Sequence, residues 1–200
     1  MHKYILHIII MSALLFHLAC DGDDNPSDPD SETYSEGDTI SSEHQEMEFG
    51  YCYPTCPSNP DNCDDLTTDA TFSLLQHSGK VFMIEMSAAW WTPCFSHISV
   101  GDAVYKNWEN DDRVEIVHFL DDIGTPYYSC LQWGYAGEKF IPPIVDDGAL
   151  YPFRDLFPMD DVKYPLTIFI NDEMEIVGIY SVLLGIDDVN AIIQNMLDNI

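Results

Sequence analysis

The sequence predicts an α/β fold in which a mixed central sheet is flanked by helices. Residues 80–88 (KVFMIEMSA) form a mostly apolar run of strand length, which is typical of a strand covered on both faces. A segment with helical spacing follows, and strand-like and helix-like segments then alternate toward the C-terminus. This alternation indicates a sheet with helices packed on its faces.

The first helix is expected over residues 92–110, directly after that strand. Pro93 suits its first turn, because the missing N–H of proline has no helical partner there. A second strand is expected at 113–120, and a second helix over 125–137, with Pro126 in its first position. Apolar side chains recur along the first helix at roughly helical spacing, at Phe95, Ile98, Val104 and Trp108.

The last part of the chain predicts a hairpin followed by a helix. Residues 164–170 and 175–183 are strand-like and are joined by a short polar turn, which makes them antiparallel neighbours. Residues 185–200 are expected to be helical, with Asp187 as the N-cap. The buried stripe of this helix is expected to consist of Val189, Ile192, Ile193, Met196 and Leu197.

Length and charge limit the classes of function. The chain of 200 residues is 46% hydrophobic, which suits one domain of ordinary size plus flanking segments. Its 35 Asp and Glu against 7 Lys and Arg give a formal charge of −28. Nucleic acid and anionic lipid head groups would be repelled, so neither is expected as a partner.

Residues 1–19 are typical of a secretory signal peptide. A short basic start precedes an apolar run that is too short to span a membrane comfortably; an uncleaved membrane anchor is the alternative. The run ends in LFHLAC, which resembles a bacterial lipobox with Cys20 as the lipid-bearing first mature residue, although His17 departs from the usual pattern. We therefore expect an exported protein, anchored through lipid at Cys20 and facing the periplasm.

Residues 20–50 are expected to be a disordered acidic tether. The segment after Cys20 carries many carboxylates, no Lys or Arg and few apolar groups, so it is not expected to bury enough surface to fold. No stretch matches a calcium-binding loop. The folded domain is expected to span residues 66–200.

Residues 51–65 are expected to be a cysteine-rich loop containing Cys52, Cys56 and Cys63. In an exported protein such a cluster favours a disulfide between two of the three. The sequence CYPTCP also matches the copper-binding motif of Sco-type proteins, but two sulfurs without a third ligand make a poor site. We predict no metal and no cofactor.

Residues 88–94 carry a resemblance to a known family. The sequence AAWWTPC after the first long strand resembles the A-x-W-C-x-P-C motif of thioredoxin-like proteins, and more narrowly of the TlpA/redoxin branch of exported thiol-disulfide proteins. The resemblance covers 66–200 and implies a thioredoxin-like fold. It also implies a cis peptide bond between Tyr164 and Pro165, facing the active-site sulfurs.

One motif position departs from the family, because Trp91 replaces the first cysteine. That cysteine is the family's nucleophile, its thiolate stabilised at the helix start; only the second cysteine, Cys94, remains. Cys94 could act as a lone thiol, or pair with Cys130 in a relocated disulfide. A peroxidase is disfavoured, because Ser87 and Trp91 stand where its motif needs Pro and Thr.

Two functions stay open from the sequence. The first is thiol-disulfide chemistry on envelope protein thiols, reduced to a single thiol, with Cys94 and Cys130 as candidate catalytic residues. The second is a non-catalytic module that binds an envelope protein or peptide. Its surface would be the former active-site face, formed by Trp90, Trp91, Pro93, Tyr164 and Pro165.

Overall fold

The computed structural model describes residues 33–52, 70–121, 126–138, 142–148, 150, 152–157 and 164–200, with the backbone alone at 126–129 and 131. All of these residues lie in one compact unit, Glu32–Ile200. The predicted signal peptide, the predicted lipidation site Cys20 and the two cysteines Cys56 and Cys63 lie outside the described residues.

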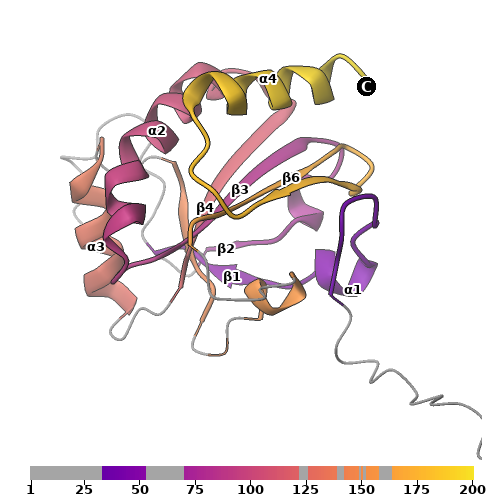
Figure 1. Ribbon diagram of the computed structural model, residues 1–200. Coiled ribbons are helices and arrows are strands. Elements are labelled where there is room, and N and C mark those ends of the chain that lie inside the picture. Colours follow the sequence, from indigo (N-terminus) through magenta and orange to yellow (C-terminus); the bar gives the residue numbers. More distant parts are fainter. Residues whose placement is uncertain are drawn as a thin grey trace, which may run out of the picture. The chain divides into compact units, whose positions relative to one another are not determined.

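Five strands form the central sheet, in the order β5-β4-β3-β6-β7 (Figure 1). β3 pairs in parallel with β4, and β4 with β5, whereas β6 is antiparallel to both β3 and β7. The predicted mixed sheet is confirmed. The strands are β3 Val81–Ala88, β4 Val114–Asp121, β5 Ile144–Asp146, β6 Leu166–Ile170 and β7 Ile176–Tyr180.

The central strand β3 explains why its sequence reads as a continuous apolar run. All eight of its residues are buried, and successive side chains point to opposite faces of the sheet. Phe82 and Ile84 pack into a core with the N-terminal part of the chain. Val81 and Met83 pack into a second core with the C-terminal helix.

Three longer helices follow the predicted order: α2 Thr92–Trp108, α3 Pro126–Ala136 and α4 Ile186–Leu197. α2 and α4 contact each other, and α4 covers β3. The predicted stripe of α4 is buried except for Ile192, which is partly buried. The predicted cap is wrong: Gly185 is the N-cap, Asp187 lies in the first turn, and Asp188 accepts a hydrogen bond from the Gly185 N–H at 3.4 Å.

Residues 33–50, predicted to belong to a disordered tether, are part of the fold. They contain α1 Ser42–Gln45 and β1 Phe49–Gly50, which pairs with β2 Thr71–Phe72. Tyr34, Ile40 and Phe49 are at most 5% exposed and join the core beneath the sheet. The average composition of 21–50 concealed these widely spaced apolar residues. The predicted tether is therefore wrong over 33–50, the predicted domain start at 66 is wrong, and residues 20–32 lie outside the described residues.

We call residues 33–52 the N-terminal strap. At one end it bonds to β7, where the Gly37 N–H donates to the Ile176 carbonyl at 2.8 Å. At the other end it bonds to β5, where Tyr51 bridges Val145 and the Cys52 N–H donates to the Ile144 carbonyl at 2.9 Å. The strap therefore contacts both outer strands of the sheet and protects backbone groups that an exposed edge would leave unpaired.

Across the described ranges, no helix combines the length and apolarity needed to cross a membrane.

Candidate functional site

The carboxyl end of β3 leads through Ala89 and Trp90 into α2. Trp91 has extended backbone angles and occupies the N-cap position, and Pro93 lies in the first turn. The first-turn placement predicted for Pro93 is confirmed. Trp91 therefore occupies the helix start, where free N–H groups would stabilise a thiolate if a cysteine stood there.

Two tryptophans form the exposed surface of this site. Trp90 is 54% exposed and Trp91 42% exposed, and their rings meet edge to face with centroids 5.8 Å apart. The Trp91 indole N–H donates to the Tyr164 carbonyl at 3.1 Å, and the Trp90 ring stands edge-on to the Tyr164 ring. The Tyr164–Pro165 bond is cis, as predicted. The structure thus brings together Trp90, Trp91, Tyr164 and Pro165.

Cys94 lies one turn inside α2 and is a free thiol with no exposed surface. Burial raises the pKa of the Cys94 thiol, so the thiolate that would attack a disulfide is scarce. The expectation that Cys94 lies deeper than a normal nucleophile agrees with this geometry.

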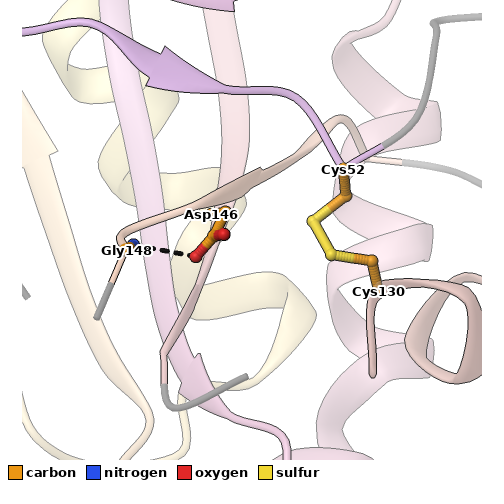
Figure 2. The surroundings of a disulfide bond; sticks show 4 residues. All are labelled: Cys52, Cys130, Asp146 and Gly148. Carbon is orange, nitrogen blue, oxygen red and sulfur yellow. Dashed lines mark hydrogen bonds between the residues drawn. A yellow bond between two sulfur atoms is a disulfide. The ribbon is translucent and has the colours of Figure 1, made fainter. Parts of the chain in front are cut away.

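Cys130 does not pair with Cys94. It forms a disulfide with Cys52, 78 residues away in sequence, which joins the N-terminal strap to α3 (Figure 2). The alternative in which Cys94 pairs with Cys130 is therefore wrong, and Cys52 is not bonded to Cys56 or Cys63. The remaining possibility for the predicted disulfide among these three cysteines, Cys56 with Cys63, lies outside the described residues. Sequence spacing could not reveal this pair, because only the strap running along β5 brings Cys52 to α3.

A buried carboxylate, Glu85, lies at the middle of β3 and was missed by the sequence analysis. Its Oε1 is 3.4 Å from Nδ1 of His97, and His97 Nε2 contacts the Leu184 carbonyl at 2.8 Å. Burial alone would raise the pKa of Glu85, but the hydrogen bond with His97 and the nearby His118 lower it. The signal was a single acidic residue inside an otherwise apolar strand.

A second set of buried acids, Asp121 and Asp147, was also missed. Asp121 ends β4, and Asp147 follows β5 at a turn in which Gly148 has φ +77° and its N–H donates to the Asp146 side chain (Figure 2). Both carboxyls are at most 1% exposed. The signal was an acidic pair directly after each of two apolar segments, because such residues come to the carboxyl edge of a parallel sheet.

These two carboxyls lie on neighbouring parallel strands, one position beyond the paired residues Leu120 and Asp146, and the hydrogen bond between them requires a shared proton. Burial raises the pKa of Asp121 to about 6. Burial, followed by the negative charge of Asp121, raises the pKa of Asp147 to about 8. The Tyr164 hydroxyl donates to Oδ2 of Asp121, so the acid pair lies directly behind the aromatic surface.

No group of His, Cys, Asp and Glu side chains within the described parts of the chain could hold a metal ion. The copper-motif alternative loses its first ligand, because Cys52 is in a disulfide and has no thiolate to offer.

The fold has counterparts among solved structures. A secreted thiol-disulfide isomerase from Corynebacterium glutamicum superposes with a TM-score of 0.63 at 9% identity, over 83% of this chain and 97% of that one. A putative protein disulfide isomerase from Bacteroides thetaiotaomicron superposes with a TM-score of 0.60 at 13% identity, over 82% and 89%. The fold is thioredoxin-like.

A third thioredoxin-like structure, the pneumococcal exposed lipoprotein thioredoxin Etrx1 from Streptococcus pneumoniae, superposes with a TM-score of 0.55 at 14% identity, over 74% of this chain and 98% of that one. The sequence matches no protein-family model and no curated protein. At these identities the likeness establishes the thioredoxin-like fold alone.

Proposed function

We propose that this protein is an exported, lipid-anchored thioredoxin-like module of the bacterial envelope that has lost dithiol exchange and binds a protein or peptide segment through Trp90 and Trp91. One observation carries the proposal. The helix start, where the fold would stabilise a thiolate, is occupied by an exposed indole that is hydrogen-bonded to the Tyr164 carbonyl.

Dithiol exchange needs two sulfur atoms that act one after the other. The first forms a mixed disulfide with the substrate, and the second attacks that bond and releases the reduced substrate. Trp91 offers no sulfur for the first step, and Cys94 is buried beneath the surface. The chain therefore lacks the pair of steps that would reduce a substrate disulfide at this site.

The same substitution creates a surface suited to binding. Tryptophan supplies a large, rigid contact area at little entropic cost, and aromatic residues dominate the energetics of most interfaces. Two tryptophans side by side, each more than two-fifths exposed, form such an anchor. Export and lipid anchoring are supported by the signal-like run and the LFHLAC motif, and the neighbours include a secreted protein and an exposed lipoprotein.

A second candidate is single-thiol redox chemistry through Cys94, favoured by one observation. The free thiol and the Cys52–Cys130 disulfide belong to the same buried apolar cluster. If the Cys94 thiolate attacked this disulfide, a new bond to Cys130 would form, and Cys52 would leave as a thiolate and take up a proton. Such exchange would need no outside oxidant.

The two candidates differ in an insulin-reduction assay with dithiothreitol as the electron source. We expect almost no turnover from the wild type. Trp91→Cys should raise the rate by at least about tenfold, because it restores a nucleophile at the helix start, three residues before Cys94. Trp91→Ser is the matched control, since it uncovers the same surface without a sulfur. Turnover in Trp91→Ser equal to that of Trp91→Cys would favour chemistry by Cys94 alone.

Binding is tested with a displayed library of random peptides selected on the full chain. Trp90→Ala should weaken a selected peptide by about 30-fold, the effect of truncating an aromatic anchor. Val177→Ala, which shortens an exposed apolar side chain on β7, should leave it unchanged. Equal affinity of the wild type and Trp90→Ala would remove the binding proposal.

A further inference from the structure

The buried acids behind the aromatic surface form a continuous hydrogen-bonded chain. Nη1 of Arg154 donates to the Tyr164 hydroxyl at 3.3 Å, this hydroxyl donates to Asp121, and Asp121 is hydrogen-bonded to Asp147. The Tyr164 carbonyl in turn accepts the Trp91 indole N–H. Tyr164 therefore links the acid pair to the exposed Trp91, because its hydroxyl contacts Asp121 and its carbonyl contacts the Trp91 indole.

The distribution of the proton in the pair follows from its other contacts. Asp147 accepts the Phe153 N–H at 2.8 Å and the Arg154 N–H at 2.9 Å, so both of its oxygens are held by the backbone. Oδ1 of Asp121 receives no donor from the other described groups, apart from a proton on Asp147. The proton therefore lies between the two acids, where it satisfies the Oδ1 atom of Asp121 that otherwise has no donor.

Among the described residues, four elements face the pair, and each contributes its own charged or titratable groups. Besides the two acids, from the ends of β4 and β5, these are Tyr164 from the segment before β6 and the short helix Arg154–Leu156 with Arg154 and Asp155. The Arg154 guanidinium compensates the single charge on Asp121, and it is itself held at 2.7 Å by Asp155. A second negative charge at the pair would therefore add repulsion between Asp121 and Asp147.

The geometry points to a proton-controlled latch: loss of the proton shared by Asp121 and Asp147 releases Tyr164 and, through its carbonyl, the Trp91 side of the aromatic surface. The proton leaves Asp147 for solvent. Two buried carboxylates at hydrogen-bond distance then repel each other, and Asp147 is fixed by the backbone. Asp121 must move, which breaks its bond to the Tyr164 hydroxyl.

The direction of the pH response follows from the raised pKa values. A carboxyl that holds its proton more tightly when folded contributes stability that is complete below the ordinary pKa of an aspartate. That contribution is lost as the pH rises and is gone above the folded pKa, at about 8 for Asp147. We expect the latch to be closed in mildly acidic solution and to open as the solution becomes alkaline. The inference that this pH response regulates ligand binding rests on the proposed function. The latch itself does not depend on the proposed function.

The test uses fluorine NMR of the full chain labelled with fluorotryptophan, titrated from about pH 6 to about pH 9. Trp91→Phe assigns the Trp91 resonance. This resonance should shift with a midpoint near the folded pKa of Asp147. Trp108 ends α2, away from the acid pair, and its indole N–H donates to the Asn190 side chain in α4. The resonance of Trp108 should therefore not shift.

Asp147→Asn should abolish the shift, because residue 147 can then no longer ionise. Asp121→Asn is the second variant, since it retains an acceptor for Tyr164 and leaves both oxygens of Asp147 to the backbone. Over the same range, the unfolding equilibrium constant of the wild type should rise at least about tenfold more than that of either variant.

Asp112→Asn, which removes an exposed charge, should behave like the wild type. The latch is overturned if the Trp91 resonance does not titrate in the wild type, or if it titrates with the same midpoint in both Asp147→Asn and Asp121→Asn. Neither result bears on whether peptides bind, which the display experiment measures separately.

Discussion

Trp91 and Cys94 lie three residues apart, one at the start of α2 and the other a turn inside it. The first position faces solvent and the second does not, so this stretch has a protected thiol and no accessible one. A buried free cysteine behaves mainly as a small apolar side chain. In the proposed function, the side chain at position 91 therefore determines whether this surface carries out thiol-disulfide exchange or binds a protein or peptide segment.

We predict that Cys94 of the folded, non-reduced protein resists iodoacetamide, because the thiol is fully buried and its pKa is raised. Peptide mass mapping should find Cys94 unmodified at neutral pH and fully modified after unfolding in guanidinium, which is the control. Rapid modification of Cys94 in the folded protein would show that the surface opens, and would favour the single-thiol candidate.

At the scale of elements, the N-terminal strap packs against the sheet and pairs with it, although its acidic composition predicts a disordered segment. Its apolar residues form part of the core beneath the sheet, and its two ends pair with the outer strands β7 and β5. The Cys52–Cys130 disulfide joins the end of the strap to α3. The strap is therefore an integral layer of the domain.

We predict that Cys130→Ser lowers the free energy of unfolding by about 2–4 kcal/mol, because the unfolded chain loses a cross-link across a long loop. Urea titration measures the change, and Cys52→Ser should give the same result. The double variant should add nothing to either single variant, since both remove one bond. A double variant twice as destabilised as each single one would mean that the two cysteines act separately.

Across the whole molecule, negative charge dominates and the few described cations are engaged. Lys80, Lys106, Arg113 and Arg154 are paired with Glu115, Glu138, Asp111 and Asp155, respectively. A domain of this charge is repelled by anionic head groups. In the proposed function, attachment to a membrane therefore comes from a segment outside the folded unit, which the lipidation motif at Cys20 predicts.

We predict that Cys20→Ser releases the protein from membranes, because Cys20 would carry the acyl chains that hold it there. Fractionation of bacterial cells into membrane and soluble parts, with immunodetection, measures the change. Ser12→Ala, inside the apolar run, is the control and should remain bound. A Cys20→Ser variant that stays in the membrane fraction at full length would identify residues 1–19 as an uncleaved anchor.

The regular elements were predictable to different degrees, for identifiable reasons. β3 and α4 carry long patterns, one continuously apolar and the other with a helical stripe, and both form where expected. β5 has only three residues, too few for a pattern. The cap of α4 was misplaced because an aspartate at either of two neighbouring positions can accept backbone N–H groups, and the chain uses Asp188.

Local sequence by itself determined the order β3, α2, β4, α3, β6, β7 and α4, the Trp-Trp-x-Pro-Cys stretch and the lack of a cysteine at position 91, since all of these depend on neighbouring residues. Only the tertiary structure decided the partner of Cys130, the folding of the strap and the pairing of Asp121 with Asp147. These depend on contacts between residues far apart in the chain, from 26 positions for the acids to 78 for the cysteines. Side-chain periodicity carries no record of such contacts, because they arise when separate strand ends meet at one edge of the sheet.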